Sequence, residues 1–346
     1  MGRVVLVTGV SGYLGGKLAS HLVRDPDVSR VIGVDVVPPS RELDRIEFVR
    51  TDLRTTGIAK VIRRSGADTV AHLNMIMNPV RAGGRVPMKE LNVLGSMQLL
   101  AACQRAGSVR RLVFRSGAVF YGCGPRSPAL FSEDTEPVPS PASGWGRDLV
   151  EVERYLRDFS RRRPDVEVAS LRMAHVIGPE IRTSLTDYFC LPVLPTPAGF
   201  DARLQFLHEH DALRALHSAA LSHCVGAINL AGDGVLMLSQ AARLAGRPVA
   251  PLPRIAAPLL RRLVPRGLDI DLSADQLRLL SFGSVLDTTR MRRDMRFEPL
   301  FSTREAFEDF VRGRHLPGAR RLDRSTDPHR SEQPSRTPVT TCGEPE

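Results

Sequence analysis

The residues with the clearest chemical potential form a glycine-rich turn near the N-terminus. The segment TGVSGYLG at residues 8–15 follows an apolar run at Val4–Val7 and opens a helical pattern. Glycines at this spacing permit a tight turn, close approach of the backbone to a pyrophosphate, and close packing of helix on strand. Free amides at the start of the helix would then face the phosphates. A glycine turn that binds no ligand is the less favoured interpretation. The turn therefore predicts cofactor contacts from Gly9, Ser11, Gly12, Tyr13, Leu14 and Gly15.

A carboxylate at the end of the next apolar run supports this prediction. Asp35 lies 20 residues after Gly15. An acid at this place accepts hydrogen bonds from the adenosine ribose hydroxyls and repels a 2′-phosphate. The sequence therefore predicts NAD in preference to NADP, although Arg41 is close enough in sequence to keep NADP as an alternative.

Alternating strands and helices must position these groups. The helical patterns are Lys17–Arg24, Ile58–Arg64 and Leu91–Ala106. The strand-like apolar runs are Val4–Val7, Val31–Val34, Ile46–Val49, Thr69–Leu73, Leu112–Phe114, Val166–Leu171 and Ala227–Leu230. Such alternation indicates a doubly wound α/β fold with a mainly parallel sheet of about seven strands. The first five runs are mainly apolar rather than alternating, as strands buried on both faces should be.

Composition excludes several other classes of protein. The chain has 346 residues, of which 42% are apolar and 25% charged, which is typical of a globular protein. No stretch approaches the roughly 18 consecutive apolar residues of a membrane span, and the N-terminus lacks the features of a signal peptide. Five cysteines without a CxxC pair argue against a disulfide framework and a zinc site. We therefore expect no metal and a cytoplasmic location with reduced thiols.

The net charge of +10 does not indicate a nucleic-acid partner. Of 48 cationic residues only Lys17, Lys60 and Lys89 are lysines, and the arginine runs lack any nucleic-acid-binding signature. A phosphate-binding surface is one interpretation of these runs, but solvated helix ends are favoured.

Further motifs occur in the order typical of one family. In chain order they are Thr51-Asp52-Leu53, Ala71-His72-Leu73-Asn74, LNVLGS at 91–96, VFYG at 119–122, LRMAHVIGP at 171–179 and FLHEHD at 206–211. With the glycine turn, they resemble the extended short-chain dehydrogenase/reductase family, and more narrowly its NAD-dependent epimerase/dehydratase group, over residues 3 to about 313. The resemblance implies a nucleotide-sugar-like substrate and a homodimer formed through helices at about 88–106 and 145–159. It also implies cofactor contacts from Asp52, Leu53, Leu73, Asn74, Asn92 and Ser116.

The catalytic positions of that family are substituted. A Tyr-x-x-x-Lys pair and a serine or threonine perform its acid/base step. The family's Lys-x-x-x-Glu stretch aligns Arg147 with the lysine and Ser143 with the tyrosine, and the count back from Tyr121 aligns Gly117 with the serine or threonine. No tyrosine lies between residues 122 and 154, so a shift of register supplies none. Arg147 could still donate to a nicotinamide ribose, whereas the usual proton transfer is lost.

Two residues are candidates for a replacement acid or base. His175 falls where the family has a substrate-contacting asparagine, and histidine titrates near neutrality. A hydrogen-bonded structural histidine explains His175 equally well. Tyr188 is the second candidate, although packing is its favoured role. Arg203 is a candidate for contact with a substrate phosphate.

The resemblance also implies how the chain is divided. Residues 1–171 plus 205–231 would form the NAD-binding domain, and residues 172–204 plus 232–313 a smaller substrate lobe. Four prolines in residues 251–272 favour part of that lobe over a membrane-surface helix. Residues 317–346 are polar and predicted to be disordered. Two functions remain open: an NAD-dependent enzyme with a non-standard acid/base set, or an NAD-binding sensor or scaffold without turnover.

Overall fold

A computed structural model of the chain describes residues 2–39, 45–78, 82–137, 144–253 and 274–321. Ser143, most of the proline-rich segment at 251–272 and residues 322–346 lie outside the described residues.

A parallel sheet forms the centre of the molecule. Its seven strands, in spatial order, are β11 (Gly226–Leu230), β6 (Glu167–Met173), β5 (Arg111–Gly117), β4 (Thr69–His72), β1 (Arg3–Thr8), β2 (Val28–Asp35) and β3 (Glu47–Arg50). Every neighbouring pair is parallel. The predicted doubly wound α/β fold with a mainly parallel seven-stranded sheet is therefore confirmed.

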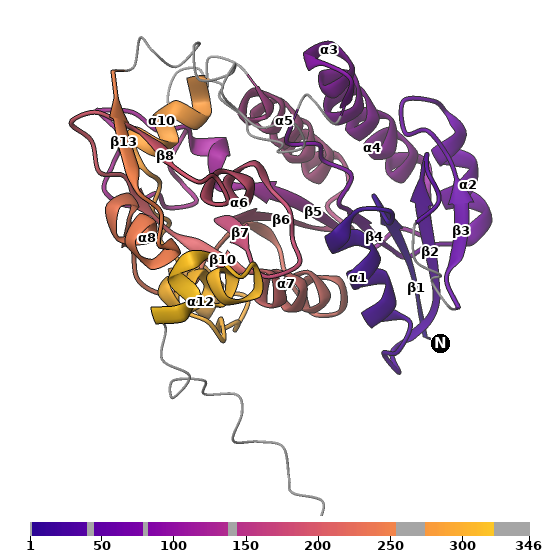
Figure 1. Cartoon of the computed structure of the whole chain (residues 1–346). Coiled ribbons are helices and arrows are strands. Elements are labelled where there is room, and N and C mark those ends of the chain that lie inside the picture. The colour runs from indigo at the N-terminus through magenta and orange to yellow at the C-terminus, as the bar shows by residue number, and fades with distance from the viewer. Residues whose placement is uncertain (1, 40–44, 79–81, 138–143, 254–273, 322–346) are drawn as a thin grey trace, which may run out of the picture.

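Helices cover both faces of this sheet (Figure 1). One face packs against α1 (Tyr13–Leu22) and α7 (Glu209–Leu221). The other packs against α2 (Gly57–Ser65), α4 (Gly95–Arg105) and α5 (Trp145–Arg162). A short α3 (Arg85–Lys89) and a π-helical turn at Glu90–Leu94 lead into α4, and a 3₁₀ turn at Ala118–Tyr121 follows β5.

The pleat of β1 explains why its central residues Val4–Val7 are all apolar. Val5 and Val7 belong to the core on the α1 side, whereas Leu6 belongs to the core on the α2 side. Successive side chains of a strand point to opposite faces, so a strand covered on both faces needs apolar residues at every position.

A smaller lobe lies at the β11 end of the sheet, on the left of Figure 1. Its helices are α6 (Ser184–Phe189), α8 (Leu238–Ala245), α10 (Ala274–Phe282) and α12 (Thr303–Gly313). Its paired strands are β7 (His175–Ile177) with β10 (Phe206–His208), β9 (Arg203–Leu204) with β12 (Leu236–Met237), and β8 (Leu194–Pro197) with β13 (Val249–Leu252). The remaining elements are α11 (Thr289–Arg293), which packs near β11, and a 3₁₀ turn at Pro317–Arg321. An aromatic core that includes Tyr188, Phe189 and Phe307 holds the lobe together.

Within the described ranges, no helix is both long and apolar enough to cross a bilayer. The same part of the chain contains no group of three or more His, Cys, Asp or Glu side chains arranged to hold a metal ion.

Candidate functional site

The glycine turn joins β1 to α1 at the carboxyl edge of the sheet. Gly9 has a φ of 73°, and a Cβ atom on it would lie 2.9 Å from the backbone nitrogen of Asn74. A Cβ atom on Gly15 would overlap the carbonyl oxygen of Gly9. The backbone amide of Gly12 donates to that same carbonyl at 3.0 Å. The turn is thus folded on itself so closely that Gly9 and Gly15 exclude any side chain.

The start of α1 is open to an anionic ligand. Gly12 at the N-cap provides no side-chain hydrogen bond to the first helical turn, and that turn contains no acidic residue. The first amides of a helix lack partners within the helix and carry partial positive charge, which favours phosphate groups. The residues of this turn therefore fit the pyrophosphate of a dinucleotide.

Asp35 stands beside the turn at the end of β2. Its carboxylate accepts hydrogen bonds from the backbone amides of Ser11 at 3.1 Å and Val36 at 2.8 Å. The Ser11 hydroxyl donates to the carbonyl oxygen of Val37. An ionised carboxylate has about four acceptor sites, so Asp35 is held in place and keeps acceptor capacity for a ligand. This arrangement fits the ribose hydroxyls of an adenosine.

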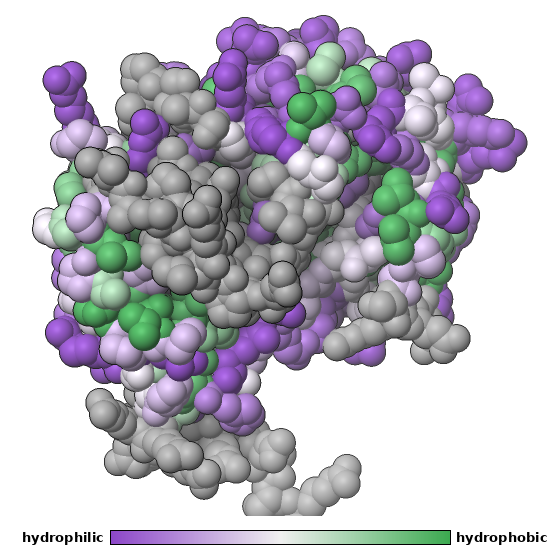
Figure 2. All heavy atoms as spheres, turned by 45° about the horizontal axis from the view of Figure 1, so that its top comes forward, coloured by the Kyte–Doolittle hydropathy of each residue, from purple (hydrophilic) through white to green (hydrophobic). Residues whose placement is uncertain are grey.

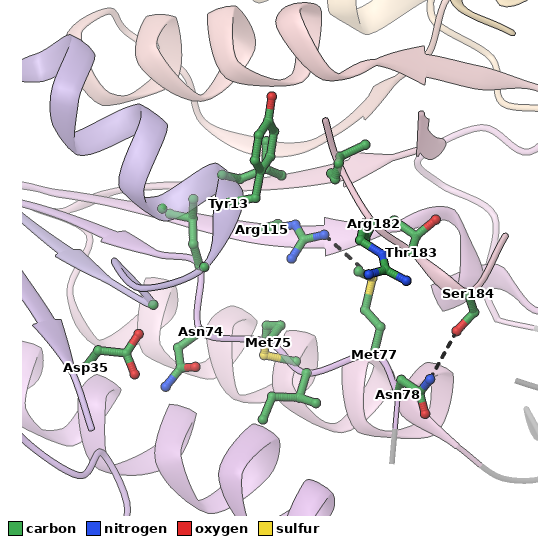
Figure 3. Close-up of a pocket in the computed structure, with 17 residues that line it drawn as sticks. Tyr13, Asp35, Asn74, Met75, Met77, Asn78, Arg115, Arg182, Thr183 and Ser184 are labelled. Atoms are coloured by element: carbon green, nitrogen blue, oxygen red, sulfur yellow. Dashed lines mark hydrogen bonds between the residues drawn. The ribbon is translucent and has the colours of Figure 1, made fainter. Parts of the chain in front are cut away.

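An outer cavity of about 310 Å³ extends from the turn along the carboxyl edge of the sheet. In Figure 3, Asp35 lies at one end of this cavity and Ser184, hydrogen-bonded to Asn78, at the other. Its walls are Gly9, Gly12, Tyr13, Leu14, Gly15, Asp35, the segment Leu73–Asn78, Arg115 and the segment Ile181–Ser184.

A smaller inner cavity of about 80 Å³ adjoins the outer one. The two cavities share Met77, Arg115, Thr183 and Ser184 as lining residues. The inner walls further include Ser116, Gly117, Ala118, Val119, Trp145, Met173, Ala174, His175, Val176, Leu185 and Gln276. Strand ends of the sheet and residues of the lobe thus line two adjoining cavities of one cleft, as expected at the carboxyl ends of parallel strands.

Trp145 occupies the space beside Gly117. A Cβ atom on Gly117 would lie 2.8 Å from the indole Cη2 of Trp145, the first residue of α5. The side chain that the family places at the Gly117 position would therefore meet the indole ring. Because Trp145 is the only tryptophan in the chain, its fluorescence reports directly on the inner cavity.

Arg115 is a cavity residue that the sequence analysis missed. It follows the apolar run Leu112–Phe114 in β5 and lines both cavities. Its Nη2 lies 3.6 Å from the sulfur of Met77, and burial lowers the pKa of Arg115 to about 10. A charged residue directly after the apolar run Leu112–Phe114 was the available signal.

The two acid/base candidates lie in different places. His175 begins β7, where it pairs with Phe206 of β10, and it lines the inner cavity. Its imidazole makes no hydrogen bond to another residue in the described part of the chain. Burial lowers the pKa of His175 to about 4, so its imidazole is neutral at pH 7. Tyr188 is fully buried in the aromatic core of the lobe, where its hydroxyl donates to the carbonyl oxygen of Pro195 at 3.0 Å. Burial raises the pKa of Tyr188 well above its usual value, and Tyr188 lines neither cavity.

A buried polar network supports the floor of the inner cavity. Glu153 of α5 forms a 2.5 Å ion pair with Arg172 of β6, and each side chain is only 4% exposed. The hydroxyl of Ser116, the residue before Gly117, donates to Glu153 at 2.6 Å. Arg172 also donates to the oxygen of Tyr121 at 2.9 Å. The network connects β5, β6 and α5, the elements that place Ser116, Gly117 and Trp145.

Asn92 acts on the outer cavity through the backbone. Its side-chain oxygen accepts from the amide of Ile76 at 2.8 Å, and its side-chain nitrogen donates to the Ile76 carbonyl at 2.9 Å. Asn92 itself is fully buried, so it orders the segment Leu73–Asn78 that forms one cavity wall.

The remaining predicted residues lie outside the two cavities. Asp52 forms a 2.7 Å ion pair with Arg54, which contributes to a lowered pKa of the Asp52 carboxyl, and Leu53 is buried. Arg147 is exposed on α5, and the exposed Arg203 donates to the carbonyl oxygen of Ala129 at 3.1 Å.

The sheet, its crossover helices and the turn between β1 and α1 define a Rossmann-type α/β protein. The family model described as "NAD dependent epimerase/dehydratase family" matches residues 5–226. The chain therefore belongs to the NAD-dependent epimerase/dehydratase family.

Three similar proteins illustrate its place in that family. An uncharacterised protein of Mycobacterium tuberculosis is 45% identical over 332 residues, which cover 95% of this chain and 87% of that protein. The Thermus thermophilus UDP-glucose 4-epimerase in complex with NAD is 24% identical, with a TM-score of 0.69 and coverage of 90% of this chain and 99% of that one. MoeE5 in complex with UDP-glucuronic acid and NAD is 22% identical, with a TM-score of 0.69 and coverage of 93% and 100%. At these identities the two structures establish the fold.

Proposed function

We propose that this protein binds NAD in the outer cavity and acts on a nucleotide-sugar-like substrate whose reacting end enters the inner cavity. The observation that carries the proposal is the adjacency of the two cavities, which share Arg115: the glycine turn and Asp35 line the outer one, and Trp145 and His175 line the inner one. NAD supplies hydride transfer when it is bound. The NAD and nucleotide-sugar complexes of proteins with the same fold support this proposal.

Asp35 supports NAD over NADP. Its carboxylate lies at the end of the outer cavity beside the amide of Ser11. A 2′-phosphate at this place would bring two negative charges together, whereas ribose hydroxyls would donate to the remaining carboxylate acceptors.

A different alignment of α5 with the family's motif places the counterpart of the catalytic tyrosine next to Gly117, the counterpart of the catalytic serine or threonine. Glu153, rather than Glu151, is the buried glutamate of the helix. Counting the family's Lys-x-x-x-Glu spacing back from Glu153 aligns Leu149 with the lysine and Trp145 with the tyrosine. Two residues that serve one reacting oxygen must lie side by side, and Trp145 does lie against Gly117. In this alignment Arg147 no longer corresponds to the family's lysine, and Ser143 no longer corresponds to its tyrosine.

His175 is the proposed acid/base residue. It lines the inner cavity, and its imidazole is neutral at pH 7 because burial lowers its pKa to about 4. A neutral imidazole can accept the proton of a substrate hydroxyl, and the hydride of the carbon that bears this hydroxyl would pass to NAD when the cofactor is bound. Trp145 and Met173 on the same walls exclude water from that step.

Calorimetric titration with NAD and NADP, followed by UDP-sugars, tests the binding part of this proposal. We expect tighter binding of NAD than of NADP and a further heat when a UDP-sugar is added to the NAD complex. The variant His175→Gln should lose turnover in a product assay while its Kd for NAD stays within about twofold of the wild type. Absence of dinucleotide binding, or full turnover by the variant, would contradict the proposal.

A second candidate function is an NAD-binding sensor or scaffold without turnover. It is favoured by Trp145 over Gly117 and by Leu149, which is fully buried in the core. Neither indole nor leucine transfers a proton. NAD binding without product from any UDP-sugar, in the wild type as in His175→Gln, would favour this candidate.

We also propose a homodimer and a cytoplasmic location. The homodimer would form through helices at about 88–106 and 145–159. Val86, Leu94 and Met97, on or beside α3 and α4, are 71%, 39% and 40% exposed. The face that Figure 2 turns forward is mainly polar, with separate apolar patches. Light scattering coupled to gel filtration should give twice the mass of the chain, and Met97→Glu should shift it to the monomer mass.

A further inference from the structure

Arg115 lies where the outer and inner cavities meet. In the described part of the chain, the one hydrogen bond of its side chain is the 3.6 Å contact from Nη2 to the Met77 sulfur. A thioether is a weak and uncharged acceptor. Figure 3 shows the guanidinium directed toward Met77 in the middle of the cleft, between Asp35 and Ser184. A permanent cation therefore faces the cleft with no charged partner from the described residues.

Other buried arginines of the sheet have carboxylate partners. Arg111, on the same strand, forms a 2.5 Å ion pair with Glu167, and Arg172 forms one of 2.5 Å with Glu153. Arg115 has no acidic side chain within ion-pair distance in the described ranges. Burial of an unpaired charge is costly unless a ligand compensates it. The contrast indicates that the partner of Arg115 comes from outside the chain.

The charge of the cleft walls is asymmetric. Asp35 is the one acidic residue that lines either cavity within the described ranges, and it lies at the end beside Ser11. Around Arg115 the walls contain Thr183 and Ser184, and the outer cavity also contains Arg182, which lies 3.4 Å from the carboxylate of Asp187. The inner half of the cleft is therefore positive.

We infer that Arg115 binds a carboxylate of the substrate at the mouth of the inner cavity, so that the substrate is a sugar acid rather than a neutral sugar. This inference rests on the proposed function for the position of the substrate. A planar guanidinium pairs with a carboxylate through two parallel hydrogen bonds. Arg115 and His175 both line the inner cavity. The bound carboxylate would therefore lie in the same cavity as the substrate hydroxyl on which His175 acts.

Two pairs of titrants isolate the carboxylate. UDP-glucuronic acid and UDP-glucose share the nucleotide and differ at the carbon that bears the carboxylate, and free glucuronate and glucose make the same comparison without a nucleotide. Binding is followed by the fluorescence of Trp145 and by calorimetry, with and without NAD. The variants are Arg115→Gln, Arg115→Lys, and Arg304→Gln as a control on exposed α12 surface outside both cavities.

We expect the wild type to bind each acid at least about tenfold more tightly than its neutral counterpart, as for a charge-assisted pair. Arg115→Gln should reduce this preference to about twofold or less without changing the Kd for NAD. Arg115→Lys should keep part of the preference for the acids over their neutral counterparts. The control Arg304→Gln should keep the full preference.

Four results would overturn the inference. The first is a wild type without preference for the acids, and the second is a preference that survives in Arg115→Gln. If Arg115→Gln weakened the binding of UDP-glucuronic acid and UDP-glucose equally, Arg115 would be assigned to the diphosphate. If it weakened the binding of NAD alone, Arg115 would be assigned to the cofactor site. An Arg115-dependent preference for free glucuronate with no binding of either UDP-sugar would support the inference and contradict the nucleotide-sugar part of the proposed function.

Discussion

The buried ion pair beneath the inner cavity allows a prediction of stability. In Glu153→Gln the side chain keeps its shape but loses the charge that faces Arg172. Glu153 accepts hydrogen bonds from the hydroxyls of Ser116 at 2.6 Å and Ser170 at 3.1 Å, and from Nε and Nη2 of Arg172. An amide nitrogen placed among these donors cannot accept from them.

The size of the effect follows from this burial. Removing one partner of a buried ion pair costs about 3–5 kcal/mol, because the other charge remains buried and unpaired. At a urea dependence of about 3 kcal/mol/M, the midpoint of unfolding should fall by roughly 1 to 2 M. Urea unfolding at pH 7, followed by circular dichroism and by Trp145 fluorescence, measures this shift.

A surface ion pair provides the matched control. Arg30 and Glu47 lie 2.6 Å apart with side chains 48% and 55% exposed. Glu47→Gln should therefore change the free energy of unfolding by less than about 1 kcal/mol. Equal effects of Glu47→Gln and Glu153→Gln would refute the argument that burial makes the Glu153–Arg172 pair different.

Three further changes test the turn, the cofactor preference and the buried histidine. Gly15→Ala should weaken NAD binding by about tenfold or more, because the added Cβ atom would overlap the Gly9 carbonyl and open the turn. Calorimetry measures this change, and an unchanged Kd for NAD would contradict the geometry. Asp35→Ala should narrow the ratio of NADP to NAD dissociation constants, and an unchanged ratio would remove Asp35 from the ribose site. Burial lowers the pKa of His72 to about 4 from an ordinary 6.5, so between these values the unfolded chain binds a proton that the native protein does not. The free energy of unfolding should therefore fall as pH decreases from 6.5 to 4, by up to about 1.4 kcal/mol per pH unit from this group, and His72→Gln should reduce that slope.

The fold and the adenosine end of the site were predictable because their signals are local. Strands buried on both faces are mainly apolar, and the runs Val4–Val7 of β1, Val31–Val34 of β2 and Leu112–Phe114 of β5 meet this requirement. The turn needs glycine at Gly9 for its positive φ and at Gly15 because a side chain there would overlap the Gly9 carbonyl, and both reasons act within the turn. Asp35 follows from the end of β2, since strand ends meet at one edge of a parallel sheet.

The inner cavity could not be worked out in the same way, because long-range packing decides it. The register of α5 depends on which glutamate reaches Arg172, and Glu151 and Glu153 are equivalent until β6 is packed against the helix. The indole of Trp145 reaches Gly117 only across the gap between α5 and β5.

The sequence by itself determined a Rossmann-type sheet and a turn suited to a dinucleotide, because strand burial and turn sterics are properties of short segments. Only the tertiary structure decided that Arg115, Trp145 and His175 line one cavity. These residues come from β5, α5 and β7, and their proximity depends on how the sheet, its helices and the lobe pack together.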